Sequence, residues 1–417
     1  MPCELSRFAT STLGSAVVGM RRRADAIAAT GIEIIDFGAG EPDFDVPEPV
    51  REAAIRAIRE GHGHYVDPRG LPDLRAGIAR FEADRHGLRF HPDQVVVTAG
   101  SFAGLSIATR AILEPGDEII VIEPCWGPYR NLAVLTGAVP VAVPMEATGG
   151  RFVLDAARIH AAITPKTKAI VLNSPWNPTG RVVSEAELTG LAELADRHDL
   201  WIIADEVYAE LVFDGARHVS IAALDPSIAE RTITISSFSK SFAMTGWRLG
   251  YCMAPPAVTE VLARLNHYTT RCATSIVQYA GIAALAEGSA CVEDMRIQYQ
   301  QRRDTIVEGL RAIPGVQCPS PEGTFYAFAR VPLEWGDSRA IAQYLLESHG
   351  IIVSAGAAYG ASSSRYLRFS FATSLTSIEE GLSRMCRALP PPTTLSTVKS
   401  KVTVSEFSTQ PRPLRGE

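Results

Sequence analysis

Six short runs of apolar, largely β-branched residues, separated by segments with helical periodicity, constrain the fold of this chain most strongly. They occupy residues 94–98, 118–122, 139–143, 168–173, 200–204 and 232–236. Strands that alternate with helices are typical of a mainly parallel sheet with helices on both faces. Residues 169–172 are continuously apolar, as expected of a strand that is covered on both sides. The predicted fold class is therefore α/β, with a central buried sheet.

A second, smaller domain is predicted after this region. Residues 257–310 have a helical pattern, and shorter strands at 324–329 and 366–371 alternate with helices after Pro314. A chain of 417 residues also exceeds the size at which one hydrophobic core usually keeps growing. We expect an N-terminal arm that joins the small domain at 1–45, a large domain at 46–290, a small α+β domain at 291–389 and a disordered tail at 390–417.

Composition and charge favour small molecules as partners. The net charge of -6 and pI near 5.9 give no overall attraction for nucleic acid or an anionic membrane. No signal peptide and no apolar run long enough to cross a bilayer are evident, so a cytoplasmic location is expected. The seven cysteines show no C-x-x-C pair or zinc spacing, which predicts reduced thiols and no metal site.

Lys240 follows the strand expected at 232–236, where open α/β sheets place their ligands. A lone lysine is more often a solvated surface residue, so its position alone decides little. The surrounding run SFSKSFAMTGWRLG, residues 237–250, resembles the lysine signature of class I/II aminotransferases, which are fold-type I enzymes dependent on pyridoxal 5'-phosphate (PLP). The resemblance implies that Lys240 forms a Schiff base with PLP, the internal aldimine, and that Ser237, Ser239 and Arg248 bind its phosphate.

Two further motifs carry the same resemblance. Residues 205–208 read DEVY and residues 173–180 read NSPWNPTG. Considered separately, an Asp at a strand end is commonly a helix cap, and Asn-Pro-Thr-Gly is commonly a tight turn. The family's pattern implies that Asp205 pairs with the pyridine nitrogen and that Tyr208 and Asn177 bind O3' of the cofactor, with Asn177 also beside the substrate.

The segment after the first strand is suited to a phosphate. Gly100, Ser101 and Phe102 precede or begin an apparent helix, where backbone N–H groups and the helix dipole favour an anion. The resemblance implies that these three residues form the phosphate cup. It also implies that Trp126 stacks on the cofactor ring, although a single Trp is more commonly a core aromatic.

Two motifs imply how the substrate is bound. In the strand expected around Arg368, the guanidinium lies on the face opposite Leu367 and Phe369. A guanidinium can hold a carboxylate by two parallel hydrogen bonds, and the resemblance implies that Arg368 binds the substrate α-carboxylate. The alternative is a structural Arg paired with an internal acid. In the motif GAGEPDFD, residues 38–45, the resemblance implies that Gly40 approaches the substrate through its backbone.

Quaternary structure is implied by the segment around Tyr65. This tyrosine resembles the one that reaches the phosphate of the neighbouring subunit, which implies a homodimer with shared active sites. The alternative is a surface aromatic beside a turn. Arg271 could bind a distal anion of the substrate, or it could be a peripheral ion-pair residue.

The resemblance covers about residues 30 to 388 and implies transfer of an amino group from an L-amino acid to a 2-oxo acid. In prokaryotic-type aspartate aminotransferases a lysine stands at the position matched to Phe102, so an aromatic residue here argues against aspartate. Phe102, Trp126 and Trp176 together predict an apolar or aromatic substrate side chain, although Trp176 could merely pad its loop. A PLP-dependent lyase or synthase, catalysing elimination or cyclisation, would keep the same residues. A transcription regulator with an aminotransferase-like domain is a weaker alternative, and a structural protein without a cofactor is weaker still.

Overall fold

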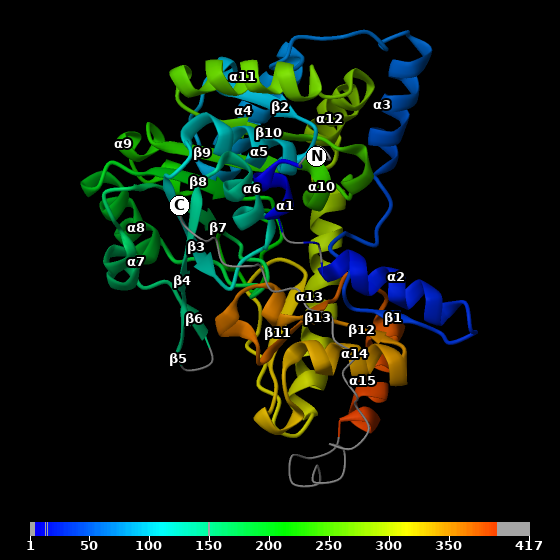
Figure 1. Cartoon of the computed structure of the whole chain (residues 1–417). Coiled ribbons are helices and arrows are strands. Elements are labelled where there is room, and N and C mark those ends of the chain that lie inside the picture. Colours follow the sequence, from blue (N-terminus) through cyan, green and yellow to red (C-terminus); the bar gives the residue numbers. More distant parts are fainter. Residues whose placement is uncertain (1–4, 13, 15, 149–150, 390–417) are drawn as a thin grey trace.

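The computed structural model describes residues 5–12, 14, 16–148 and 151–389, and Figure 1 shows their arrangement. An upper part contains the large sheet and its helices, and a lower part contains a smaller sheet with further helices (Figure 1). The predicted disordered tail at 390–417 lies outside the described residues. The predicted domain limits stay predictions, because no independent observation divides the chain at those residues.

The central sheet has seven strands in the order β2-β10-β9-β8-β7-β3-β4. All six predicted strands are present, and β10 is antiparallel to both of its neighbours whereas the other pairs are parallel. Strand β10 was missed, because it begins at the last residue of the lysine motif and its four residues give a short signal. The strands are β2 Val95–Thr98, β3 Glu118–Glu123, β4 Val139–Pro144, β7 Thr167–Asn173, β8 Trp201–Asp205, β9 Thr232–Ser237 and β10 Gly250–Met253.

Helices cover both faces of this sheet, as the continuous apolar strands predicted. In β3, Ile119 and Val121 belong to the core formed with α5, α6 and α11, whereas Ile120 and Ile122 belong to the core formed with α7 and α8. Successive side chains of a strand point to opposite faces, so both faces of β3 are buried. The flanking helices are α3 Glu48–Arg59, α4 Pro72–His86, α5 Ser101–Ile112, α6 Pro128–Thr136, α7 Ala156–Ala162, α8 Glu185–Arg197, α11 Pro256–Thr270 and α12 Ser275–Glu287.

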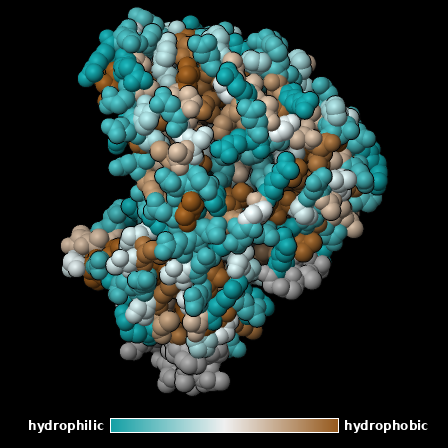
Figure 2. Space-filling view, turned by 180° about the vertical axis from the view of Figure 1, so that it is seen from behind, coloured by the Kyte–Doolittle hydropathy of each residue, from teal (hydrophilic) through white to brown (hydrophobic). Residues whose placement is uncertain are grey.

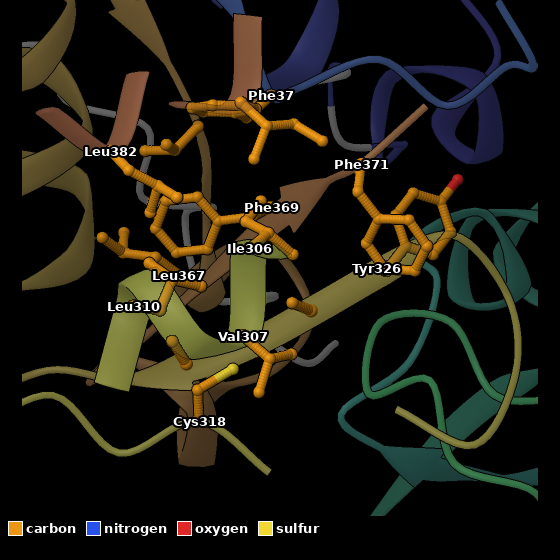
Figure 3. Packing of buried hydrophobic residues seen from close by; sticks show 14 of the residues in the cluster. Phe37, Ile306, Val307, Leu310, Cys318, Tyr326, Leu367, Phe369, Phe371 and Leu382 are labelled. Atoms are coloured by element: carbon orange, nitrogen blue, oxygen red, sulfur yellow. The ribbon is translucent and has the colours of Figure 1, made fainter. Parts of the chain in front are cut away.

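The lower part is built on a three-stranded antiparallel sheet in the order β11-β14-β13. Figure 3 shows its core, in which Ile306 and Leu310 lie with Leu367, Phe369 and Phe37. Both strands expected here, at 324–329 and 366–371, are present. The elements are β11 Tyr326–Arg330, β13 Ser354–Ala355 and β14 Tyr366–Ser370, with α13 Ser289–Ala312, α14 Ser338–His349 and α15 Leu375–Ala388.

The N-terminal segment is joined to the lower part by main-chain pairing. Strand β1 (Ile35–Asp36) runs parallel to β12 (Ile351–Ile352), and α2 (Ala16–Ala28) lies near β12 (Figure 1). After β1 the chain continues through Gly38 and Gly40 towards the upper part, so these glycines lie where the two parts meet. The remaining short elements are α1 Arg7–Thr10, β5 Glu146–Thr148, β6 Arg151–Val153, α9 Pro226–Ala229 and α10 Phe238–Ser241.

The surface in Figure 2 is mostly hydrophilic, with hydrophobic side chains in separate patches and an indentation between the upper and lower parts. Among the described residues, no single helix is long and apolar enough to cross a membrane. Helices α12 and α13 reach that length and composition only as a pair, and the pair is bent by 76°.

The six cysteines in the described ranges are all free thiols, as predicted. Cys125, Cys252 and Cys318 are buried, and burial raises the pKa of each thiol to about 12. Cys272 is partly buried, and Cys291 and Cys386 are exposed.

Helix α13 offers a matched test of the lower core. Ile306 is fully buried in this core, whereas Ile297 on the same helix is 53% exposed. We expect Ile306→Ala to lower the free energy of unfolding by about 2 to 5 kcal/mol, because it removes buried apolar contacts and leaves a cavity. Ile297→Ala, with the same change in helix propensity, should alter it by about 0.5 kcal/mol or less. Chemical denaturation measures both, and equal losses would contradict the packing described.

Candidate active site

The carboxyl ends of three neighbouring strands form the floor of the candidate site. Strands β7 and β8 end at Asn173 and Asp205, which are paired in register, and β9 ends at Ser237, just before Lys240. The side-chain amide of Asn173 donates to the backbone carbonyl of Asp205 at 2.9 Å, and its Oδ1 accepts from the N–H of Asn177 at 2.8 Å. The sheet therefore brings together three of the predicted motifs.

Lys240 lies on the short helix α10, whose first N–H groups are capped by Ser237. The hydroxyl of Ser237 accepts from the N–H of Ser239 at 3.3 Å, and both serines are buried. The Nζ of Lys240 donates a hydrogen bond to the carbonyl oxygen of Gly40. It also lies 5.9 Å from the centroid of the Tyr208 ring. The predicted lysine, tyrosine and glycine thus share one space.

The pKa of Lys240 falls from 10.5 to about 8, chiefly because burial disfavours the ammonium form. The nearby guanidinium of Arg368 contributes to this decrease, while the carboxylates of Glu41 and Asp205 act in the opposite direction. A substantial fraction of the amine is therefore neutral near physiological pH. A neutral amine can act as a nucleophile and as a base, which the ammonium form cannot.

Asp205 is a buried carboxyl group at the end of β8. Its Oδ2 accepts from the hydroxyl of Tyr129 at 2.7 Å, and its Oδ1 accepts from the N–H of Val207 at 3.4 Å. Burial raises its pKa to about 6, although the hydrogen bond from Tyr129 works in the opposite direction. No lysine, arginine or histidine in the described part of the chain forms a salt bridge with it. Asp205 can therefore accept a hydrogen bond from a protonated ring nitrogen.

Glu206, the second acid of the DEVY motif, makes a separate set of contacts. Its carboxylate accepts from the hydroxyl of Ser220 at 2.7 Å and lies 3.1 Å from Nε2 of His218, and all three residues are buried. Only Asp205 of the two acids contacts Tyr129. The structure thus separates one acid that faces the site from one that braces the following loop.

A cradle for a phosphate group lies at the start of α5. Gly100 caps this helix with φ +81°, and a Cβ placed on it would come within 2.4 Å of Nη2 of Arg248. A Cβ on Gly250 would come within 2.6 Å of the backbone nitrogen of Ser101, and Gly250 is paired with Ser237 in the sheet. The first N–H groups of a helix have no intrahelical acceptor, so they and the Arg248 guanidinium suit a dianion.

Arg368 is a buried cation without a carboxylate partner among the described residues. It donates to Oδ1 of Asn177 at 3.2 Å and to the carbonyl of Gly38 at 3.0 Å, and its Nε has no partner in that part of the chain. The Arg368 guanidinium lies 4.0 Å from the centroid of the Tyr326 ring. The alternative of an internal ion pair is therefore wrong here, and the guanidinium remains able to bind an external carboxylate.

Tyr326 is a site residue that the sequence did not reveal. Its hydroxyl lies 3.0 Å from that of Tyr208, and its ring lies under the Arg368 guanidinium. The sequence placed it in a strand, where a single tyrosine usually packs in a core. Tyr129 was missed for the same reason, because neither tyrosine belongs to a motif whose spacing points to the cofactor. Only the packing of β11 and α6 brings them to Arg368 and Asp205.

Phe102 and Trp126 do not belong to the strand ends that form the floor of the site, and they lie at its side. Phe102 is 44% exposed, and its ring packs edge-on against Trp126 at 5.7 Å. Trp126 in turn packs edge-on against Tyr129 at 5.5 Å. Because Tyr129 donates to Asp205, these aromatics form a continuous wall that extends from the carboxylate to the surface.

Trp176 takes no part in this wall. Its side chain is fully buried, and its indole N–H donates to the carbonyl of Pro124 at 2.6 Å. The reading of Trp176 as part of a substrate pocket is therefore wrong, and the residue fills the space behind its own loop. The prediction of an apolar substrate loses one of its three supports.

Tyr65 and Arg271 contact each other and take no part in the contacts described for Lys240, Asp205 and Arg368. Tyr65 is 77% exposed, and the guanidinium of Arg271 lies 4.9 Å from the centroid of its ring. Arg271 forms no salt bridge within the described ranges, so the expectation of a peripheral ion pair is wrong. Within one chain, no described contact joins Tyr65 to Lys240 or Arg248.

Comparisons with known proteins identify the family of this chain. Residues 32–385 match the family model for aminotransferase class I and II. The putative aminotransferase YugH of Bacillus subtilis is 43% identical over 372 residues, which cover 89% of this chain and 95% of YugH. The aspartate aminotransferase of Thermus thermophilus solved with maleate has a TM-score of 0.88 at 37% identity, covering 93% of this chain and all of that one. The aromatic aminotransferase of Pyrococcus horikoshii has a TM-score of 0.83 at 36% identity, covering 88% and 98%.

The chain belongs to the class I and II aminotransferase family. It is a PLP-dependent transaminase with the fold-type I architecture. The named relatives are aminotransferases, so the lyase and synthase alternative is not supported. The residues present also fit the cofactor, because a buried carboxylate, a guanidinium beside a helix start and a partly neutral lysine surround one space.

The depressed pKa of Lys240 leads to a pH-dependent expectation. In enzyme stripped of cofactor, the rate of PLP uptake by the amine should rise with pH and reach half its maximum near pH 8. Arg368→Gln removes a cation that disfavours the ammonium form, so the pKa should rise and the profile should move to higher pH. Stopped-flow absorbance measures the rate. Arg330→Gln, an exposed substitution on β11, is the control, and identical profiles for Arg368→Gln and wild type would contradict the electrostatic coupling.

Proposed function

We propose that this transaminase transfers the amino group of an L-amino acid with an aromatic or apolar side chain to a 2-oxo acid. The observation that carries the proposal is the meeting of a lysine amine, a buried carboxyl group and an unpaired buried guanidinium at one end of the sheet. One group is suited to proton transfer, one to a cationic ring and one to a substrate carboxylate.

Ten residues hold the cofactor in this proposal, in addition to Lys240. Asp205 accepts from the pyridine nitrogen, and its hydrogen bond from Tyr129 keeps the carboxyl group ionised at a lower pH than burial alone would allow. Tyr208 and Asn177 are the donors for the phenolic oxygen. The phosphate group is held by Gly100, Ser101, Phe102, Ser237, Ser239 and Arg248. Trp126 covers the ring.

The reaction assigns separate tasks to Lys240 and Arg368. PLP, when bound, supplies an electron-withdrawing ring that stabilises negative charge at the substrate Cα. Arg368 holds the substrate carboxylate by two parallel hydrogen bonds, and Asn177 and Gly38 fix the plane of its guanidinium. This orientation presents the Cα proton to Nζ of Lys240, which removes the proton and later returns one. The carbonyl of Gly40 keeps Nζ in place between these steps.

The preference for an aromatic or apolar side chain depends on the wall formed by Phe102 and Trp126. These rings present apolar surface next to the Asp205 and Tyr129 pair, and they offer no cation for an acidic side chain. Several relatives are named for aspartate or for both aspartate and prephenate, which makes an acidic substrate the competing outcome of the test.

Product analysis tests the reaction and the side-chain preference together. We expect 2-oxo acid to accumulate from phenylalanine, tyrosine or leucine only while a second 2-oxo acid is supplied as acceptor, and without release of ammonia. Replacing Phe102 with Lys should shift the ratio of kcat/KM values towards aspartate, because the new ammonium attracts the distal carboxylate. Steady ammonia release without an acceptor would contradict transamination. A wild-type preference for aspartate would contradict the proposed substrate class.

We also propose a homodimer in which Tyr65 reaches the phosphate of the neighbouring subunit's cofactor. Its high exposure in a single chain and its contact with Arg271 support this proposal, since a large aromatic paired with a cation at the surface is suited to an interface. A further exposed aromatic, Tyr268, lies on the same helix end as Arg271. The cytoplasmic location remains a prediction.

Hybrid dimers test whether Tyr65 acts between subunits. Co-expressed chains that carry Lys240→Ala and Tyr65→Ala separately should form one intact site, because the lysine of one chain receives the tyrosine of the other. Hybrids of wild type with a chain that carries both substitutions should have no intact site and should bind PLP more weakly. Differently tagged chains allow the hybrids to be purified and their cofactor affinity measured. The reverse pattern would show that Tyr65 acts within its own chain.

A further inference from the structure

A cavity of about 600 Å³ lies beside the loop that carries Asn177. Its walls come from the end of that loop, from strand β6 and from the segment that follows α13. Thr179 and Arg181 contribute from the loop, and Arg311 and Ser320 contribute from the lower part of the molecule. None of the residues to which the site assigns cofactor or substrate contacts lines this cavity.

Arg181 is a buried cation in this wall with spare hydrogen-bond donors. Its side chain is only 6% exposed, and Nη2 donates to the carboxylate of Glu187. Its Nε and Nη1 are buried and have no hydrogen-bond partner among the described residues. A buried donor without a partner costs free energy, so a small movement of the wall that let an acceptor reach Nε or Nη1 would be favourable.

The remaining charges of the wall also favour an anion. Arg311 donates from Nε to the carbonyl of Cys318 at 2.8 Å and from Nη2 to the hydroxyl of Ser320 at 3.0 Å. No acidic side chain in the described ranges forms a salt bridge with Arg311. The third cation, Arg151, is paired with Glu322 at 2.6 Å, and Glu322 is the one carboxylate in the wall. Arg181 is paired with Glu187 and Arg151 with Glu322, so Arg311 is the guanidinium of this wall that has no carboxylate partner among the described residues.

We propose that this cavity is a second binding site for a small multivalent anion, a polycarboxylate or a phosphate compound. Planar guanidiniums bind both groups through paired charge-assisted hydrogen bonds, and the volume lies within the usual range of small-ligand sites. The hydroxyls of Thr179 and Ser320 add neutral partners at the same wall.

The cavity is mechanically linked to the active site. A Cβ on Gly180 would come within 2.2 Å of Pro321 and 2.8 Å of the carbonyl oxygen of Tyr326, so the loop is pressed against this segment. The carbonyl of Gly180 accepts from the N–H of Glu322 at 2.7 Å. An anion that draws Arg181 and Arg311 together acts on the loop that carries Asn177, and we expect a change in KM. This consequence rests on the proposed function, whereas the binding itself does not.

Isothermal titration calorimetry of the PLP-loaded enzyme at constant ionic strength tests the site with citrate and with inorganic phosphate as probes. We expect saturable binding of at least one probe, and the probe that binds identifies carboxylate or phosphate as the preferred group. Arg311→Gln, which replaces an exposed side chain, should weaken binding on the order of tenfold. Arg181→Lys should weaken it as well, whereas Arg339→Gln, an exposed arginine on α14 outside the cavity, should not.

The variant Arg368→Gln distinguishes anion binding at the active site from anion binding in the cavity. If the anion occupies the cavity, its affinity persists in Arg368→Gln and falls in Arg311→Gln. The proposal is overturned if neither probe binds wild type, or if affinity is lost in Arg368→Gln and retained in Arg311→Gln. Transamination that persists without anion binding would refute this inference alone, whereas anion binding without transamination would refute the proposed function alone.

Discussion

The arrangement of the site depends on holding two cations and one carboxyl group in a shared buried space. Lys240 and Arg368 repel each other there, and burial disfavours the charged form of the lysine, so its pKa falls to about 8. Asp205 is affected in the opposite direction and has a pKa raised to about 6. Such a set of charges persists only where rigid cores on both sides fix the groups.

The packed cores of the upper and lower sheets provide that rigidity. The upper sheet fixes Asp205 and Lys240 at its strand ends, and the lower sheet fixes Arg368 and Tyr326 on adjacent strands. The N-terminal segment joins them, because Gly38 accepts from Arg368 and Gly40 accepts from Lys240. The segment is held in turn by pairing of β1 with β12. A shift between the two cores would therefore change the environment of the lysine amine directly.

The loop that carries Asn177 has two faces with different charge environments. On one face, Asn177 contacts Arg368 in the active site. On the other, Arg181 and Arg311 line a cavity with an excess of positive charge. Gly180 makes this arrangement possible, since a side chain at its φ of +69° would be strained and would collide with Pro321. Substrate binding and charge in the cavity thus act on the same short stretch of backbone.

The sequence by itself determined the α/β class, the positions of the six parallel strands along the chain and the motifs around Lys240, because strand periodicity and motif spacing are local properties. It did not determine β10, whose four residues carry a short signal, or the burial of Trp176, whose partner Pro124 is distant in the chain. Tyr129 and Tyr326 became visible as site residues only in the tertiary structure. Their hydrogen bonds to Asp205 and Tyr208 span 76 and 118 residues, and no local pattern encodes contacts of that range.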